Sequence, residues 1–339
     1  KEMSIGLCLV ALLAWFTFYV LLSGNSAQTL GSTFVRADIR FVSMGFACMF
    51  LFVNCEAANI RLLMRTFGKK VPYWRSLSYA FTDFYFSAIT PSATGGQPMQ
   101  LYYMVRDGFG AAHSSFSLLA TAAVYQMTVL VYGCVMVGAN LPFVMGQGRV
   151  IRLLLVFGIL VNGFCSGLIL LIILNGLLAE KTMLWIAGAL SRAGIIKNRK
   201  RAVQRVEGLI DEYSRGGSYL RQYPLAAVRM FIHSAVQLTA LYLVPYWACR
   251  ALGLSVQIKD VLALQAILSL AVTAVPLPGS VGASEGSFLA LYRTLLGTGQ
   301  SFSVMLLSRG ISFYAMLCIS GLVTAFLQFA RRGKSASPV

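Results

Sequence analysis

Two short segments rich in glycine, proline and hydroxyl residues interrupt an otherwise apolar chain, and their composition suits the binding of an anion. The first is TPSATGGQP at residues 90–98, and the second is PLPGSVGASEG at residues 276–286. Proline ends a helix and glycine lets a ligand approach the backbone closely, so each segment can expose unpaired N–H groups where the next helix begins. Such groups lie at the positive end of the helix dipole, which favours phosphate or carboxylate.

The candidate binding groups in these two segments are backbone amides and neutral hydrogen-bonding side chains. They are Thr90, Ser92, Thr94, Gly95, Gly96, Gln97, Gly279, Gly282 and Ser284. One such segment could equally be a tight turn that binds nothing. Because a similar segment occurs twice, at corresponding places in the chain, we favour a ligand site.

Three charged residues fall within or beside these apolar stretches, where an unpaired charge is costly. Arg309 lies eight residues into the last long apolar stretch, and either binds a lipid phosphate or neutralises Glu285 or Asp83. Asp83 and Glu285 could attract a cationic headgroup or carry protons, and Glu285 could instead cap the N-terminus of its helix. Glu56 is interpreted as a residue of the membrane interface.

The composition of the chain predicts a polytopic membrane protein. Of 339 residues, 58% are hydrophobic and 12% are charged, and the mean hydropathy is +0.73. A membrane core of about 30 Å requires about 20 helical residues, and six stretches reach that length. They cover residues 3–22, 41–60, 114–139, 153–178, 224–249 and 301–329.

Two further apolar stretches, at residues 76–89 and 261–275, are too short to cross the membrane. Each runs into one of the glycine-proline segments and is followed by a short amphipathic return. This pattern predicts two re-entrant helical hairpins, at residues 76–105 and 261–296. Irregular backbone at that depth is tolerated only where protein or water surrounds it.

The order of these elements predicts an all-α polytopic membrane protein with an inverted-topology repeat. The chain reads span, span, hairpin, span, and then the same again, so about six transmembrane helices and two hairpins are expected. Residues 1–145 form the first repeat and residues 146–334 the second. The hairpin tips then converge near the middle of the membrane, where secondary transporters bind their substrates.

The net charge of +17 is explained by membrane topology rather than by binding of nucleic acid, because most of the 28 lysines and arginines fall on one predicted side of the membrane. That side holds the loop at residues 61–75, the segment 181–222 and both termini. The pattern predicts a multi-pass plasma membrane protein of bacterial type with its termini in the cytoplasm. Segment 181–222 reads as an amphipathic helix at the anionic inner surface.

Both glycine-proline segments resemble the membrane region of the lysylphosphatidylglycerol synthase/flippase family, and the resemblance covers nearly the whole chain. The residues that carry it are Thr90, Pro91, Gly95, Gly96 and Pro98, and then Pro276, Pro278, Gly279, Gly282 and Glu285. The resemblance implies a lipid flippase that moves phospholipids, including aminoacylated ones such as lysylphosphatidylglycerol, between leaflets by alternating access. Ser280 departs from the pattern, since a second glycine is expected there.

Other functions remain open on the sequence alone. A polyprenyl-phosphate carrier would use phosphate-binding hairpins equally well, and an intramembrane enzyme could use Asp83, Glu285 and a histidine on lipid headgroups. We expect a transporter rather than an enzyme, because the chain has no H-E-x-x-H and no soluble aminoacyl-transfer domain. No cofactor, metal or nucleic acid is expected. The expected partners are membrane phospholipids, and a second copy of the chain and a separate lipid-modifying synthase are further candidates.

Overall fold

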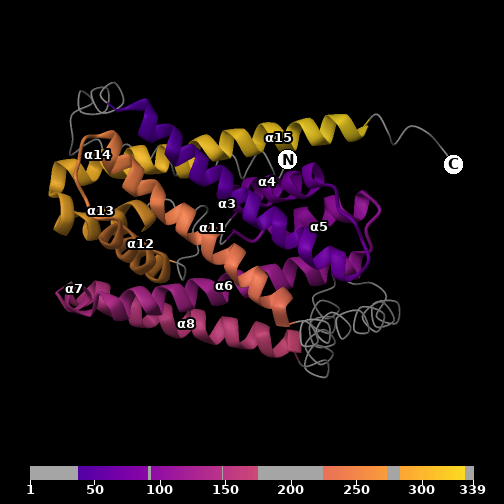
Figure 1. Ribbon diagram of the computed structural model, residues 1–339, viewed down its shortest axis with the longest axis horizontal. Coiled ribbons are helices and arrows are strands. Elements are labelled where there is room, and N and C mark those ends of the chain that lie inside the picture. The colour runs from indigo at the N-terminus through magenta and orange to yellow at the C-terminus, as the bar shows by residue number, and fades with distance from the viewer. Residues whose placement is uncertain (1–36, 91–92, 147, 175–223, 273–282, 333–339) are drawn as a thin grey trace, which may run out of the picture.

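The computed structural model describes residues 37–90, 93–146, 148–174, 224–272 and 283–332, and within them every regular element is helical (Figure 1). The elements are α3 (Ile39–Thr66), α4 (Tyr73–Ile89), α5 (Gly96–Arg106), α6 (Ala111–Ala139), α7 (Leu141–Met145), α8 (Arg149–Leu174), α11 (Pro224–Ala251), α12 (Ile258–Val272), α13 (Ala283–Leu296), α14 (Thr298–Arg309), the π-helix η3 (Gly310–Ala315) and α15 (Met316–Arg332).

Within the part of the chain that the structure describes, four helical stretches are long and apolar enough to cross a membrane. They are α3, α6, α11 and the continuous run Thr298–Gln328. They confirm the spans expected at residues 41–60, 114–139, 224–249 and 301–329 as long apolar helices. The stretch at 153–178 is helical as far as Leu174, in α8, and is apolar over Leu155–Phe164. The span expected at 3–22 and the amphipathic segment 181–222 lie outside the described residues.

Helices α3 and α11 form the centre of the bundle and pack antiparallel along their length. The N–H of Asp38 donates to the carbonyl of Ala251 at 2.9 Å where α3 begins. Nearer the other end, Asn59 bridges to α11 through Ser234 and His233. These contacts define two ends of the bundle, which we call the Asp38 end and the basic end. The basic end holds the turns at residues 67–72 and 107–110, together with Lys69, Lys70, Arg75 and Arg106.

A pair of helices, α4 and α5, occupies the place of the first predicted hairpin and begins at the basic end, and its re-entrant course through a membrane stays a prediction. α4 and α5 lie against each other, and the Gln100 side chain donates to the carbonyl of Tyr79 at 3.2 Å. At the tip, Ser87 Oγ donates to the carbonyl of Ala93 at 3.4 Å, and Ala93 adopts a left-handed φ of 55°. α4 starts three residues before the predicted hairpin.

The second hairpin, α12 and α13, begins at the opposite, Asp38 end (Figure 1). The Gln265 side chain donates to the hydroxyl of Tyr292 at 3.0 Å and joins its two helices. Its tip, residues 273–282, lies outside the described residues. In each hairpin the second helix packs against the next helix along the chain, α5 against α6 and α13 against α14. The two hairpins therefore occupy similar places at opposite ends of the bundle.

The last predicted span, at residues 301–329, is helical and contains a π-helical segment. η3 begins immediately after Arg309 and runs from Gly310 to Ala315. The side chain of Ser312 donates to the carbonyl of Ser308 at 2.8 Å within this segment. A π-helical turn changes the direction of the side chains on either side of it and is frequent at functional sites. It sets Arg309 and Phe313 in the positions described below.

The contact between α6 and α12 depends on the absence of a side chain at Gly133. A Cβ added there would lie 2.4 Å from Cδ1 of Leu270, whereas a Cβ added at Gly138 on the same helix would meet nothing within 4 Å. We expect Gly133→Leu to destabilise the protein by about 1–3 kcal/mol through overpacking. Gly138→Leu is the matched control, and the measurement is thermal unfolding in detergent. Equal melting temperatures for the two variants would contradict this packing.

Candidate functional site

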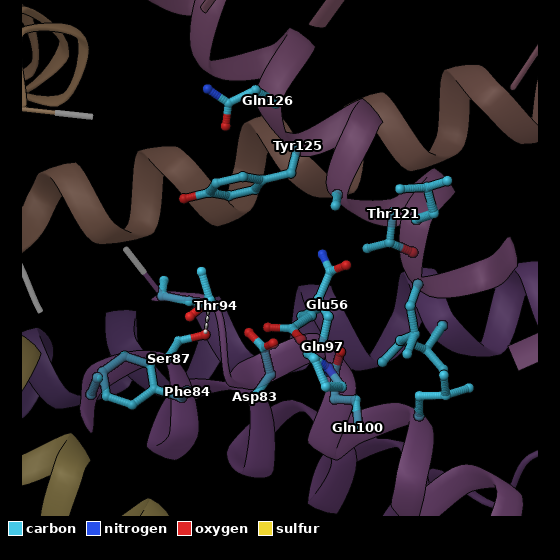
Figure 2. Close-up of a pocket in the computed structure, with 18 of the residues that line it drawn as sticks. Glu56, Asp83, Phe84, Ser87, Thr94, Gln97, Gln100, Thr121, Tyr125 and Gln126 are labelled. Atoms are coloured by element: carbon cyan, nitrogen blue, oxygen red, sulfur yellow. Dashed lines mark hydrogen bonds between the residues drawn. The ribbon is translucent and has the colours of Figure 1, made fainter. Parts of the chain in front are cut away.

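A cavity of about 950 Å³ lies beside the first hairpin (Figure 2). Its walls come from α3, α4, α5 and α6, with one residue each from α11 and η3. Most of the wall is apolar, and includes Phe52, Ile60, Phe84, Leu118 and Phe313. The polar groups come from the hairpin and from the facing sides of α3, α6 and α11. The cavity therefore combines an apolar wall with a small number of converging polar groups, as ligand sites do.

The polar groups of this cavity lie deep in the bundle. Glu56 lies ten residues before the end of α3, which is about 15 Å from the basic end at 1.5 Å per residue. Tyr125 lies fourteen residues after the start of α6, or about 21 Å from the same end. Groups at this depth in a membrane-spanning bundle are shielded from bulk water. Polar side chains there usually have a functional reason.

Two carboxylates, from Glu56 on α3 and Asp83 on α4, face the same part of the cavity (Figure 2). Glu56 Oε1 accepts a hydrogen bond from Gln100 Nε2 at 2.6 Å, and the charges of Glu56 and Asp83 interact. The lining residues include no lysine, arginine or histidine. This part of the cavity is therefore acidic, and when its carboxyls are ionised it favours a cation such as an ammonium group over an isolated phosphate.

Several polar side chains in the wall, among them Gln237, Asp83 and Tyr125, have no hydrogen-bond partner among the described residues. Gln237 from α11 lines the cavity and is only 4% exposed, while Asp83 and Tyr125 line the same space. Of the three residues, Gln237 is buried, while Asp83 and Tyr125 are half-buried. The three groups thus provide hydrogen-bonding capacity for water or for a ligand headgroup.

The predicted residues of the first hairpin divide into two groups. Thr94 and Gln97 line the cavity together with Asp83. Thr90 instead closes the hairpin tip, because its Oγ1 donates to the carbonyl of Phe86 at 2.6 Å and accepts the N–H of Gly95 at 2.9 Å. Ser92 lies outside the described residues.

The glycines of this tip allow close packing within the hairpin. A Cβ added at Gly96 would lie 2.1 Å from Ser87 Oγ and 2.3 Å from Asp83 Oδ1. At Gly95 it would lie 2.6 Å from Cγ2 of Thr90. The absence of side chains therefore lets α5 start directly against α4. Ligand binding to the amides of Gly95 and Gly96 stays a prediction.

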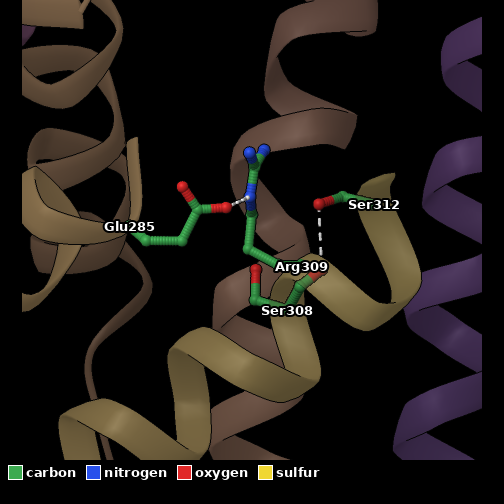
Figure 3. A network of polar contacts seen from close by, with 4 residues as sticks. All are labelled: Glu285, Ser308, Arg309 and Ser312. Atoms are coloured by element: carbon green, nitrogen blue, oxygen red, sulfur yellow. Dashed lines mark hydrogen bonds and ion pairs between the residues drawn. The ribbon is translucent and has the colours of Figure 1, made fainter. Parts of the chain in front are cut away.

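Glu285 of the second hairpin forms an ion pair with Arg309 at the end of α14 (Figure 3). Arg309 Nε lies 2.7 Å from Glu285 Oε1, and the side chains are 16% and 3% exposed. Of the two carboxylates considered as partners for Arg309, the structure pairs it with Glu285. Ser284 precedes this carboxylate at the start of α13 and is half-buried, while Gly279 and Gly282 lie outside the described residues. Phosphate binding by Arg309 stays a prediction.

Phe313 connects this ion pair to the cavity. The guanidinium carbon of Arg309 lies 4.7 Å from the centre of the Phe313 ring, a cation–π distance. Phe313 also lines the cavity beside the first hairpin. If the second hairpin moved and shifted Glu285 and Arg309, Phe313 would shift with them and change the cavity wall.

Sequence reasoning missed several residues of the cavity, Glu56, Gln100, Tyr125 and Gln237 among them. Glu56 was assigned to the interface because the apolar stretch was taken to end at residue 60, but α3 continues to Thr66, so Glu56 lies ten residues from the end of the helix. Its acidic side chain within an apolar segment was the available signal. Gln100 and Tyr125 carried no comparable signal, because only the packing of α5 and α6 brings them to the cavity.

The ion pair predicts a specific pattern of stability changes. Arg309→Gln or Glu285→Gln alone leaves one buried charge without its partner, and we expect a loss of about 3 kcal/mol from each. The double variant should recover most of that loss, because neither charge remains. Arg309→Gln combined with Asp83→Asn is the control, for which the two effects should add. Denaturant unfolding in detergent measures all of these values, and additive losses for the Glu285 pair would refute the assignment.

Comparison with known proteins identifies the family. The family model for the lysylphosphatidylglycerol synthase TM region matches residues 3–320. A UPF0104 membrane protein of Archaeoglobus fulgidus is 26% identical over 290 residues, which cover 81% of this chain and 82% of that protein. The family match thus extends over nearly the whole chain, including both hairpins and the cavity. The chain belongs to the family of the lysylphosphatidylglycerol synthase transmembrane region.

Proposed function

We propose that this membrane protein is a flippase, which moves phospholipids between the two leaflets by alternating access to the cavity beside the first hairpin. One observation carries the proposal: polar groups without partners among the described residues line a cavity deep inside an apolar bundle. A lipid headgroup cannot cross hydrocarbon without losing its hydrogen bonds to water. Polar side chains at this depth can replace those bonds during passage.

The size of the cavity agrees with a headgroup rather than a whole lipid as its occupant. A volume of about 950 Å³ lies in the range of small-molecule sites. The acyl chains would remain in the surrounding bilayer, where they lose no favourable contacts. The headgroup would contact Asp83, Gln97 and Tyr125, and the apolar wall would accommodate the first atoms of the chains.

Alternating access needs two gates, and the hairpins supply them in this proposal. α4 has 17 residues and α12 has 15, which correspond to about 25 and 22 Å and fall short of a membrane core of about 30 Å. Since they begin at opposite ends of the bundle, each hairpin would be re-entrant from its own side (Figure 1). This arrangement supports an inverted repeat of residues 1–145 and 146–334, with the basic end in the cytoplasm.

The charge of the cavity favours an aminoacylated phospholipid, such as lysylphosphatidylglycerol, over the alternative of a polyprenyl phosphate. Glu56 and Asp83 attract an ammonium group, whereas the lining residues offer no cation to a phosphate. The intramembrane enzyme is disfavoured, because neither histidine lines the cavity and Glu285 is paired with Arg309. His233 instead forms a hydrogen bond with Asn59, in which His233 Nδ1 lies 2.9 Å from Asn59 Oδ1.

Filling the cavity should block transport without unfolding the protein. Ala122 lines the cavity on α6, whereas Val131 on the same helix is 41% exposed at the outer surface. We expect Ala122→Trp to slow leaflet-resolved lipid transport in proteoliposomes by about tenfold or more, which corresponds to about 1.4 kcal/mol in activation free energy. Val131→Trp adds the same indole and should retain the rate.

The same vesicles provide the test between transporter and enzyme. Lysylphosphatidylglycerol, phosphatidylglycerol and a polyprenyl phosphate are supplied in turn, and thin-layer chromatography follows their chemical identity. The proposal expects movement of unchanged lipid, fastest for the aminoacylated one. Equal rates for Ala122→Trp and Val131→Trp, or conversion of the lipid to a new product, would contradict it.

A further inference from the structure

The carboxylates of Glu56 and Asp83 have no positively charged residue beside them among the residues described around the cavity. Both line it, their charges interact, and the titratable side chains among the described lining residues are these two and Tyr125. Glu56 accepts one hydrogen bond from Gln100, and Asp83 has no described partner. Two negative charges held together in a poorly hydrated space repel each other, so binding a single cation lowers their energy.

Groups on the neighbouring elements do not neutralise the pair. α5 contributes the neutral Gln97 and Gln100, α11 contributes the neutral Gln237, and η3 contributes Phe313. The described part of α15 that packs against α4, Met316–Gln328, contains no ionisable residue except Cys318. The nearest histidine on α11 is His233, which bonds Asn59 one turn from Glu56 along α3. Arg309 is paired with Glu285. The cation must therefore come from outside the described part of the protein.

Two cations can satisfy this requirement: a proton or the ammonium group of a lipid headgroup. Both favour the same carboxylates, so they compete for the site. Gln237, buried to 4% exposure and without a described hydrogen-bond partner, and the hydroxyl of Tyr125 add polar contacts that a headgroup can use and a proton does not need. The cavity can thus hold a headgroup with its ammonium at the carboxylates, or a proton with no lipid.

We propose that Glu56 and Asp83 exchange one proton for one cationic lipid headgroup, which makes the protein a proton-coupled lipid antiporter. The inference rests on the proposed lipid transport and adds its source of energy. On one side of the membrane, the arriving ammonium displaces the proton into the open cavity. On the other side, a proton displaces the ammonium, and the protonated cavity returns. One positive charge crosses in each direction, so the exchange balances.

The experiment uses the full chain in proteoliposomes that contain lysylphosphatidylglycerol, with valinomycin and potassium to hold the membrane potential at zero. A membrane-impermeant amine reagent measures the lysylphosphatidylglycerol in the outer leaflet, and an entrapped pH-sensitive dye measures proton movement. With a gradient of about one pH unit, one-for-one exchange should produce an asymmetry of up to about tenfold between leaflets. The lipid should accumulate on the acidic side, and reversing the gradient should reverse the asymmetry.

Variants of the two carboxylates then test whether Glu56 and Asp83 carry the exchanged proton. Glu56→Gln and Asp83→Asn should lose the gradient-driven asymmetry and the lipid-dependent proton signal. Asp260→Asn, which removes a carboxylate at the start of α12 and outside the cavity lining, should keep both. Thermal unfolding checks that each variant is folded. If Glu56→Gln does not fold, Asp83→Asn decides, because Asp83 has no described hydrogen bond to lose.

Each outcome separates coupling from transport. Wild-type protein that equilibrates lysylphosphatidylglycerol between leaflets regardless of the gradient would overturn the antiport and leave the lipid transport intact. Gradient-driven asymmetry that persists in both carboxylate variants would overturn the assignment to Glu56 and Asp83. No movement of any lipid by folded wild-type protein would overturn the proposed function and the coupling together.

Discussion

Charged side chains inside an apolar bundle need a counter-charge, a hydrogen bond or water, because hydrocarbon offers none of them, and this constraint organises the structure. Glu285 has a counter-charge in Arg309 at 2.7 Å, and Glu56 accepts a hydrogen bond from Gln100. Asp83 has no such partner among the described residues, and it faces the cavity instead. The described bundle therefore contains a closed charge pair at the second hairpin and an open acidic pair at the first.

These two pairs would divide the work of a transporter between them. In the proposed transport cycle, the open pair would provide the binding site, because its carboxyls face the cavity. The closed pair provides a contact between the second hairpin and the last long helix that must break or move when that hairpin moves. Phe313, in contact with Arg309 and in the cavity wall, lies between them, and the π-helix places it there. A movement of either hairpin can in this way affect both sites.

The sequence predicted the elements that depend on hydrophobic periodicity and on helix-breaking residues. The four long apolar helices and the first hairpin follow from the lengths of apolar stretches and from Pro91, Gly95 and Gly96. It did not predict that Glu56 lines the cavity, since the end of α3 depends on residues beyond the apolar stretch. Gln100 and Tyr125 reach the cavity only through tertiary packing. The π-helix after Arg309 has no local signature in the sequence. The pairing of Arg309 with Glu285 could not be predicted either, because it depends on how the second hairpin folds back.

The most direct test of the central claim, that a lipid headgroup occupies the cavity beside the first hairpin, is site-specific photo-crosslinking in lipid vesicles. A photoreactive phenylalanine derivative replaces Leu119, which lines the cavity, or Val135, which is 57% exposed on the outer face of the same helix. Mass spectrometry identifies the lipid adducts. Headgroup binding in the cavity predicts that the Leu119 position captures aminoacylated phospholipid in excess of its share of the vesicle, while Val135 captures lipids in proportion to their abundance. Adducts of the same bulk composition at both positions, or no lipid adduct at Leu119, would contradict it.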